Sequence, residues 1–548
     1  MAGIVTAVFQ GRGTLGGFFV QERDADADDD PRTSEGIFVY DGTPVKAGDR
    51  VRVVGTAGEY HGNTQISRAT VRVLDRGNPL PSAVSVSLPF PADDYLERYE
   101  GMRVVFPQTL TVTRTFALAR YGEIELSSGG RLLQPTDVAA PGPAARALQA
   151  ENDRNRIVLD DGRTTRYPDP APFGLSAANP LRGGDTITGL AGILHYAFGR
   201  YRIWTDEAAV DFVPANPRPA EPPATGGSLR VAGFNLFNYF TTFDTGRAIC
   251  GPSGNLECRG ARNAAEFARQ RRKIVAALAA MDADIAGLME LENTTATGAI
   301  RDLVDGLNAT AGAGTYAFVD TGIVGTDAIR VGLIYRPKTV KRIGAPAILD
   351  RSAVPAFDDG RNRPSLAQTF EEVASGERFT VAVNHFKSKA SDCDAVGDPD
   401  TGDGQGHCNR TRRNAARALV RWLATDPTGS GDPDFLLIGD FNAYAREDPV
   451  AALEAAGYAN LAPGHSHVFE GQWGALDHAL ANASLLPQVA GAARWHINAD
   501  EPPALDYRMA FKSAGQKESL YAPDPFRSSD HDPVLVGLDL GRDGAGGT

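Results

Sequence analysis

The segment FLLIGDFNAY, residues 435–444, most constrains the fold, because an apolar run ends there abruptly in Gly439, Asp440, Phe441 and Asn442. A short, unbroken apolar run between turn residues is typical of a strand that is buried on both faces. Such strands belong to α/β folds, which gather ligands and chemistry at the carboxyl ends of their strands. The segment therefore predicts a central strand that presents Asp440 and Asn442 to a crevice.

Segments of the same kind recur from residue 229 onward and alternate with helical patterns. The predicted strands SLRVAGFNLFNYF, DIAGLMELEN and FTVAVNHFKSK carry Asn235, Glu290 and His385. Between them, residues 267–281 show the periodicity of an amphipathic helix, and NRTRRNAARALVRWLATD shows it again. This alternation predicts an α/β domain over residues 229–541, with polar side chains gathered at the strand ends.

The chain before this domain consists of short β-rich runs separated by glycine turns. Residues 1–77 show no helical periodicity and predict a small all-β barrel, which resembles the oligonucleotide/oligosaccharide-binding (OB) barrel. Residues 78–213 predict a second OB-like unit, because GDTITGLAGILHYAFGRYRI echoes GDRVRVVGTAGEYHGNTQI of the first. A Pro-, Ala- and Gly-rich linker is expected at residues 214–228, and a flexible tail at 542–548.

The second unit also contains aromatic residues that allow two interpretations. They belong either to the core and rim of the barrel or to a platform on which nucleic-acid bases stack. The pattern alone favours the core. The residues concerned are Tyr121, Tyr196, Phe198, Tyr201 and Trp204.

The composition limits the classes of protein that the chain can belong to. The formal net charge of -13 argues against a broad basic surface for nucleic acid, although it allows a local basic groove. The sequence has no apolar run of transmembrane length, so we expect no membrane partner. The first residues read as a strand and lack the pattern of a signal peptide, which is therefore either absent or already removed.

The four cysteines lie in two local couples, each at the ends of a Gly- and Asp-rich loop. We predict the disulfides Cys250–Cys258 and Cys393–Cys408. Zinc binding and free thiols are the alternatives, but the spacing is not C-x-x-C and no paired histidine motif accompanies it. Disulfides form in oxidising compartments, so we expect a secreted protein of the extracellular space or the periplasm.

The strand ends carry the residue types that hydrolysis of a phosphodiester requires, namely a cation site, an oriented water and a proton donor. Glu290 and Asp530 offer hard carboxylates that suit Mg²⁺. Asp440 can orient or deprotonate the attacking water. Asn442 can donate a hydrogen bond to a phosphoryl oxygen without repelling it.

Two histidines of the same set can transfer protons near neutral pH. They are His385 in NHFKSK and His531 in SDHDP. Asp477 is expected to hold His531 in one tautomer. Lys387 and Lys389 place positive charge beside His385, where it can contact the phosphate of a substrate.

The ordered set of motifs resembles the endonuclease/exonuclease/phosphatase (DNase I-like) superfamily, and within it the large secreted bacterial nucleases of the ExeM/NucH type with an N-terminal OB-like domain. The resemblance implies a four-layer α/β sandwich and hydrolysis that depends on a divalent metal. Phrases such as GTDAIRVGLIYRP and GDFNAYAREDP carry the narrower likeness. The motifs of the wider superfamily are FN (Asn235), LMELEN (Glu290), VNHFKSK (His385), GDFNAY (Asp440 and Asn442), LDHAL (Asp477) and SSDHDPV (Asp530 and His531).

The resemblance also implies a role for each matching residue. Asn235 and Glu290 bind the metal or its waters, with Asp530 nearby. His531, paired with Asp477, acts on the water or the scissile phosphate. Asp440 and Asn442 hold and activate the nucleophile and the phosphate. His385 matches the second histidine of pancreatic-type deoxyribonuclease, which is proposed to protonate the leaving oxygen.

The sequence departs from the family pattern at three places. The carboxylate that orients this histidine in the pancreatic type has two candidates here, Asp320 and Asp327. Arg363 matches a phosphate-contacting arginine only if one gap is allowed. The loop between Cys393 and Cys408 is rich in aspartate, and calcium binding competes there with an ordinary solvated loop. The carboxylates concerned are Asp398, Asp400 and Asp403.

We therefore predict a secreted, monomeric nuclease that hydrolyses extracellular DNA, with RNA as a further substrate. The expected catalytic ion is Mg²⁺ or Mn²⁺, with Ca²⁺ in a structural or activating role. One alternative keeps the chemistry and acts on phospholipid or inositol phosphate head groups. A second alternative is a nucleic-acid-binding or adhesion protein whose nuclease domain is inactive.

Overall fold

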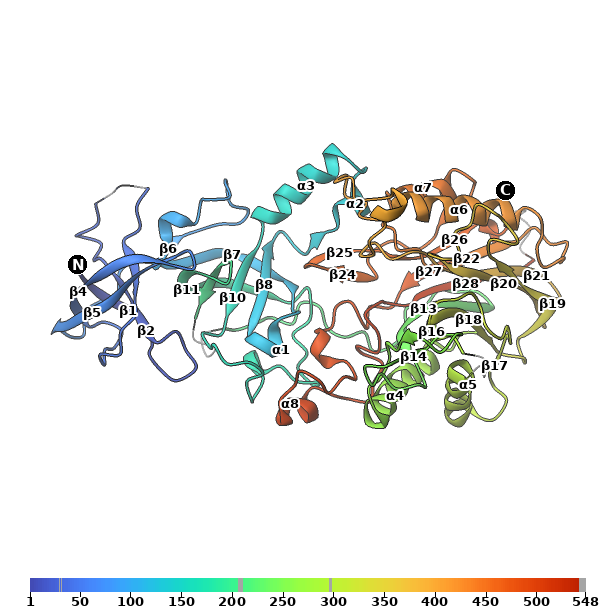
Figure 1. Ribbon diagram of the computed structural model, residues 1–548, viewed down its shortest axis with the longest axis horizontal. Coiled ribbons are helices and arrows are strands. Elements are labelled where there is room, and N and C mark those ends of the chain that lie inside the picture. Colours follow the sequence, from blue (N-terminus) through green and yellow to red (C-terminus); the bar gives the residue numbers. More distant parts are fainter. Residues whose placement is uncertain (29, 31, 206–209, 295–297, 542–548) are drawn as a thin grey trace.

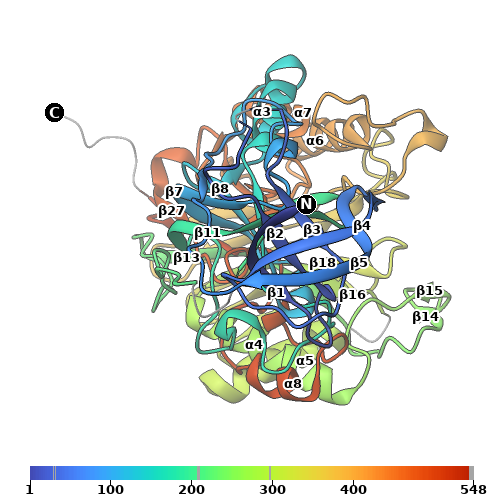
Figure 2. The same ribbon diagram turned by 90° about the vertical axis from the view of Figure 1, so that its left-hand side faces the viewer.

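Two β-barrel units and an α/β sandwich follow one another along the long axis of the molecule (Figure 1). The computed structural model describes residues 1–28, 30, 32–205, 210–294 and 298–541. The predicted tail, residues 542–548, lies outside the described residues. Figure 2 views the molecule along this axis, with strands of the first barrel nearest to the viewer.

The first unit is a closed barrel of five strands in the order β1-β2-β3-β5-β4. Strands β1 and β4 pair antiparallel and close the barrel, whereas β3 and β5 run parallel. Apolar side chains such as Val5, Phe18 and Val51 fill its interior. The strands are β1 (Ala2–Phe9), β2 (Gly17–Gln21), β3 (Gly36–Val39), β4 (Arg50–Tyr60) and β5 (Asn63–Asp75).

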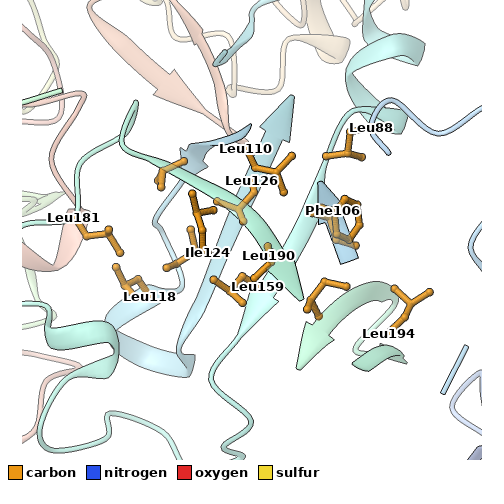
Figure 3. Packing of buried hydrophobic residues seen from close by; sticks show 14 of the residues in the cluster. Leu88, Phe106, Leu110, Leu118, Ile124, Leu126, Leu159, Leu181, Leu190 and Leu194 are labelled. Atoms are coloured by element: carbon orange, nitrogen blue, oxygen red, sulfur yellow. The ribbon is translucent and has the colours of Figure 1, made fainter. Parts of the chain in front are cut away.

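The second unit repeats this strand order. Strands β7-β8-β10-β12-β11 are neighbours in that order, β11 pairs with β7 to close the ring, and β10 and β12 run parallel as β3 and β5 do. Leucines such as Leu110, Leu126 and Leu159 form its core (Figure 3). The strands are β6 (Val84–Ser85), β7 (Arg103–Arg114), β8 (Glu123–Ser128), β10 (Ile157–Asp160), β11 (Thr186–Ala197) and β12 (Arg200–Trp204).

The repeated topology agrees with the repeat seen in the sequence, since Gly48 and Gly184 stand shortly before the matching strands β4 and β11. Short helices join the strands of the second unit. They are η1 (Glu97–Tyr99), α1 (Leu118–Tyr121), α2 (Pro135–Val138), α3 (Pro143–Arg154) and η2 (Pro172–Gly174).

The sandwich contains two six-stranded sheets. The first has the order β17-β18-β16-β13-β28-β27 and the second β19-β20-β21-β22-β26-β23. Their strands are β13 (Leu229–Tyr239), β16 (Ile285–Glu292), β17 (Ala317–Phe318), β18 (Ile329–Tyr335), β19 (Val340–Leu349), β20 (Arg363–Glu372), β21 (Arg378–His385), β22 (Phe435–Asp440), β23 (Ala459–Asn460), β26 (Asp477–Ala481), β27 (Val489–Arg494) and β28 (Val534–Leu538).

The two sheets pack face to face, and helices cover their outer faces, which confirms the predicted four-layer sandwich (Figure 1). Side chains such as Val231, Val383 and Ile438 fill the space between the sheets. Helices α4 (Ala264–Met281) and α5 (Gly298–Ala311) cover the first sheet, and α6 (Asn409–Leu423) and α7 (Asp448–Glu454) the second.

Both cysteine couples form disulfides, as predicted. Cys250–Cys258 joins the ends of the hairpin made by β14 (Ala248–Cys250) and β15 (Leu256–Glu257), and Cys393–Cys408 closes the Asp-rich loop. Among the described residues, no helix combines the length and apolar character that crossing a bilayer requires. The remaining elements are β9 (Leu132–Leu133), η4 (Asp394–Val396), β24 (His467–Phe469), β25 (Gln472–Gly474), η5 (Leu486–Gln488), η6 (Pro503–Leu505) and α8 (Ala514–Ser519).

The second barrel is joined to the sandwich by paired backbone and by buried charge. Strand β9 of the barrel pairs with β25 of the sandwich, so one small sheet spans both. Arg182 is 2 % exposed and contacts Asp500 at 3.1 Å and Glu501 at 2.9 Å. Such pairs are sensitive to mutation, because removing one partner leaves buried charge that is less well compensated.

Removal of this arginine is expected to loosen the junction. Arg182→Leu removes one cationic partner from two buried carboxylates, of which Asp500 keeps Arg131 and Glu501 keeps Arg218. The free energy of unfolding should therefore fall by about 1.5–3 kcal/mol. Urea unfolding followed by tryptophan fluorescence measures the loss. As a control, Arg50→Leu removes an ion pair with Asp75 whose two side chains are 35% and 49% exposed, and it should cost less than about 1 kcal/mol. Equal losses in the two variants would contradict the assignment.

The two barrels meet at a buried histidine. His195 is 3 % exposed and lies against Phe19 and Phe38 of the first barrel and Trp204 of the second. Burial, followed by the positive charge of Arg202, lowers its pKa from 6.5 to about 3. The ring is therefore neutral in the folded protein at neutral pH.

Acid is expected to weaken this junction. Because the folded-state pKa lies below the ordinary one, the unfolded chain binds the proton first. Stability from the neutral ring is present above pH 6.5 and is lost as the pH falls toward 3, by up to about 5 kcal/mol. His195→Phe should reduce the loss seen by calorimetry between these pH values. The exposed His61, changed to Gln, serves as the control. Identical pH profiles for His195→Phe and wild type would refute the prediction.

Candidate active site

The predicted site residues meet at one edge of the sandwich, in a cleft of about 1000 Å³. Strands β21 and β22 run parallel, so His385 and Asp440 are register partners at their carboxyl ends. Strand β26 runs antiparallel to β22, which places its first residue, Asp477, opposite Asp440. Asn235 on β13 and Glu290 on β16 reach the cleft from the other sheet. The site therefore lies between the two sheets.

His531 and Asp477 form the shortest described contact between ionisable groups in this centre. His531 Nδ1 lies 2.7 Å from Asp477 Oδ2, and Ser466 Oγ donates to the same oxygen at 2.7 Å. Burial lowers the pKa of His531, but the carboxylates of Asp477 and Asp440 outweigh it and raise the pKa well above its usual value. The imidazole is thus held as a cation in a fixed orientation.

Asp440 sits between the two histidines. Its Oδ2 lies 3.5 Å from His385 Nε2 and accepts from Asn235 Nδ2 at 3.3 Å, while its Oδ1 accepts from the backbone N–H of Asn442 at 2.8 Å. Burial raises the pKa of Asp440 to about 7, although the His531 cation opposes the shift. A carboxylate with this pKa is suited to take a proton from water near neutral pH.

His385 has a different environment. Arg363 Nη1 approaches its Nε2 at 3.4 Å, and burial together with Arg363 lowers the pKa of His385 well below its usual value. Its Nδ1 is buried without a hydrogen-bond partner among the described residues. Neither candidate orienting carboxylate contacts this atom: Asp327 accepts from Arg363 Nε at 3.1 Å, and Asp320 accepts from the backbone of Gly322. Asp327 therefore positions the arginine instead of the histidine.

Asn442 borders the same pocket beside Asp440. Its Nδ2 donates to the carbonyl of Phe386 at 3.2 Å, which ties the end of β22 to the segment that follows β21. The backbone φ of Asn442 is 47°, a left-handed conformation that asparagine tolerates better than most residues. The side chain is thereby turned toward the cleft wall next to His385.

Glu290, Asp530 and Asn235 form the candidate metal centre. Glu290 accepts from Asn235 Nδ2 at 3.3 Å and from the backbone N–H of Asn238 at 2.8 Å. Burial and the charge of Asp530 raise the pKa of Glu290, so two carboxylates converge here. Glu290 also has a φ of 62°, which is unusual for a residue with a side chain. Converging hard oxygen donors at a strained position fit a divalent cation.

The sequence analysis did not identify His467, which lies in this centre. Ligand atoms of His467, Asp530 and His531 all lie within 4.8 Å of one another, and the rings of the two histidines are 4.7 Å apart. Burial, followed by the His531 cation, lowers the pKa of His467 to about 4. His467 belongs to β24, outside the motifs at the strand ends, so no spacing in the sequence pointed to it.

The two predicted phosphate-binding lysines differ. Lys387 is partly exposed and lines the cleft, where burial and the charge of Arg363 lower its pKa. Lys389 donates to the carbonyl of Gln405 at 2.6 Å and to the buried carboxylate of Glu447. Its ammonium therefore stabilises the wall of the cleft, and Lys387 is the lysine that faces a substrate.

The Asp-rich loop uses its carboxylates for local structure. Asp398 accepts from the backbone N–H groups of Arg410 and Thr411 at 3.1 and 2.8 Å and so caps helix α6. Asp400 and Asp403 each accept from a backbone N–H two residues later. Within the described part of the chain, groups of three potential metal ligands include none of these three aspartates. The same loop brings Asp392, Asp394 and His407 together as one such group, and calcium binding in this loop stays a prediction.

The second barrel supplies one wall of the cleft, which the sequence did not reveal. Gln134, Arg146 and Gln149, on or next to helices α2 and α3, line the cleft together with the catalytic side chains. The backbone contact between Gln134 and Trp473 holds this wall in place. The cleft therefore extends well beyond the reacting centre.

Comparison with known proteins gives two matches to family models. The model of the Endonuclease/Exonuclease/phosphatase family matches residues 235–531. A model of a domain of unknown function, DUF8508, matches residues 90–216. No curated protein matches the chain in sequence.

Three similar solved structures each cover somewhat more than half of this chain. The mannosyl-6-phosphatase Bt3783 of Bacteroides thetaiotaomicron VPI-5482 is 16% identical, with a TM-score of 0.36, over 57% of this chain and 100% of that one. The human Nocturnin catalytic domain with bound sulfate is 16% identical, with a TM-score of 0.33, over 56% and 93%. D. rerio TDP2 complexed with single strand DNA product is 14% identical, with a TM-score of 0.34, over 56% and 97%.

Proposed function

Because this chain belongs to the endonuclease/exonuclease/phosphatase family, whose members hydrolyse phosphodiesters or phosphate esters, we propose that it is a secreted, divalent-metal-dependent nuclease that cleaves DNA. The observation that carries the proposal is the extent of the cleft. It continues past the catalytic side chains along a wall that contains Arg146 and Gln149 of the second barrel. A long, partly basic cleft suits a polymer of phosphodiesters better than a small phosphate ester.

The side chains of the centre divide the reaction among them. Asp440, with its pKa near 7, takes the proton of the attacking water. The His531 cation, held by Asp477, donates a hydrogen bond to the oxygen on which charge develops. Arg363 and Lys387 bind the phosphate. The negative charge of the bound phosphate offsets the positive charge of Arg363, which otherwise lowers the pKa of His385. His385 can then carry the proton that it donates to the leaving oxygen.

The metal centre supports the same chemistry. Glu290, Asp530 and Asn235 would hold Mg²⁺ or Mn²⁺, which neutralises charge on the phosphate when it is bound. The disulfides Cys250–Cys258 and Cys393–Cys408 support secretion, because such bonds persist in oxidising compartments. Extracellular DNA is then the polymer that this enzyme meets.

Cleavage of circular plasmid DNA tests the proposal. Wild-type protein is incubated with Mg²⁺, with Mn²⁺, with Mg²⁺ plus Ca²⁺, and with EDTA. We expect nicked and then linear products with either catalytic metal and intact circles with EDTA. Intact circles under every condition, combined with turnover of an inositol phosphate or a phospholipid head group, would reject the nuclease and favour an enzyme for small phosphate esters.

A further inference from the structure

A second cavity, of about 800 Å³, lies at the junction of the two barrels and is lined mainly by rings. Phe38 and Tyr60 of the first barrel and Tyr196 and Phe198 of the second contribute to it. Its described lining residues include no Asp, Glu, Lys or Arg. An uncharged cavity of this kind suits flat, aromatic ligands more than ions.

Several of these aromatic rings are exposed to solvent. Phe198 is 76% exposed, Tyr60 60% and Tyr40 57%, whereas Trp204 in the adjacent core is 1% exposed. Of the aromatic residues singled out in the second unit, Trp204 thus belongs to the core and Phe198 to the surface, and the three tyrosines are half-buried. Large exposed rings gathered in one place mark a binding surface more often than chance packing.

A third cavity, of about 470 Å³, continues from the second one because Phe198 lines both. Five arginines and three carboxylates line it, so the local charge is positive in a chain whose net charge is -13. Phe116, 70% exposed, lies in this cavity with the guanidinium of Arg114 5.5 Å from its ring centre. Arg114 and Arg200 pair with Glu125 and Arg202 pairs with Asp160, whereas Arg163 and Arg166 are exposed.

The third cavity adjoins the active-site cleft. Arg114 Nη2 contacts Glu470 Oε2 at 2.8 Å, and Glu470 lines the cleft together with Phe469, which is 54% exposed. Thr113 Oγ1 fixes the same turn by donating to the carbonyl of Gly471 at 2.7 Å. The turn between β24 and β25 therefore joins the catalytic cleft to the surface of the second barrel.

We propose that this surface, here called the aromatic track, binds single-stranded nucleic acid and leads it into the active-site cleft. The track consists of Phe469, Phe116, Phe198, Tyr60 and Tyr40, with the exposed Arg163 and Arg166 of the third cavity beside it. Exposed rings stack on unpaired bases, and arginines contact the phosphates between them. In a duplex the bases are already stacked on one another, so the track selects single strands. The inference rests on the proposed nuclease function and names its preferred substrate.

Binding measured without cleavage tests the track. The full chain in EDTA is titrated against a fluorescent oligothymidylate of about 20 nucleotides and against a duplex of the same length, and anisotropy is recorded. Phe116→Ala combined with Phe198→Ala should weaken binding of the single strand at least about 10-fold. Turnover of bis(p-nitrophenyl) phosphate, which is small enough to occupy the reacting centre alone, should stay unchanged with metal. Both rings are so exposed that their loss leaves the core intact.

Phe511→Ala is the matched control, because Phe511 is 68% exposed and lines none of the three cavities. Unchanged single-strand binding in the double variant, or an equal loss in Phe511→Ala, would overturn the inference. Equal ring-dependent binding of duplex, or competition by a neutral oligosaccharide, would overturn it as well. Ring-dependent binding of single strands without cleavage of any DNA would support the track and refute the nuclease proposal separately.

Discussion

Replacing His531 by alanine is expected to lower kcat for DNA cleavage by about 10³–10⁴-fold. The change removes the imidazolium that Asp477 and Asp440 stabilise next to the scissile bond. Asp477→Asn keeps the shape of the pair but loses the negative charge at 2.7 Å from Nδ1. Its kcat should fall less, by about 10²-fold. Steady-state kinetics on plasmid and on a small phosphodiester measure both.

The pattern of the kinetic constants separates a catalytic role from a structural one. KM should change little in either variant, because substrate binding depends on Arg363, Lys387 and the rest of the cleft. Asp305→Asn is the matched control, since Asp305 is an exposed aspartate on α5 away from the site. Circular dichroism and thermal unfolding verify the fold. A His531→Ala enzyme within about 10-fold of wild type would remove this residue from the reaction.

Glu290→Gln is expected to abolish both metal binding and activity without destabilising the metal-free protein. Glutamine keeps an oxygen that can accept from Asn238, but it removes the carboxylate that burial and Asp530 disfavour. The Tm in EDTA should therefore equal or exceed that of wild type. Wild type should gain Tm as Mn²⁺ or Mg²⁺ is added, because an ion that binds only the folded state stabilises it. The Tm of the Glu290→Gln variant should not rise when metal is added.

Calorimetric titration of the metal gives an independent reading of this prediction. We expect wild-type heats to report one high-affinity site and the variant to show none at the same concentrations. Glu292→Gln is the control, because Glu292 also belongs to β16 but is fully buried, accepts from the backbone of Thr241 and does not line the cleft. A variant at Glu290 that binds metal as wild type does would move the metal site elsewhere.

Local patterns in the sequence were sufficient for the elements of the fold. Residues 435–438 are apolar without a break and begin β22 (Phe435–Asp440), which is buried throughout. The helix predicted from residue 267 begins at Ala264, because Asn263 caps it by accepting from Glu266 N–H. The sequence repeat between the two barrels corresponds to a shared order of paired strands, since repeats of short strands and glycine turns dictate local geometry.

Contacts between distant segments could not be predicted in this way. The rings of His467 and His531 meet because a hairpin folds back over the site. The ammonium of Lys389 donates to the carboxylate of Glu447, and the carboxylate of Asp327 accepts from Arg363 instead of His385. Each of these pairings depends on how loops of different lengths close over the sheets, and no local pattern encodes that closure.

The sequence by itself determined the elements, the motifs at the strand ends and the cysteine couples, because periodicity and residue chemistry act over short distances. Only the tertiary structure decided that the second barrel walls the cleft through α2 and α3, and that Phe198 is exposed while Trp204 is buried. Those outcomes follow from the packing of whole units against each other, through contacts between distant segments such as the buried ion pair of Arg182 with Asp500.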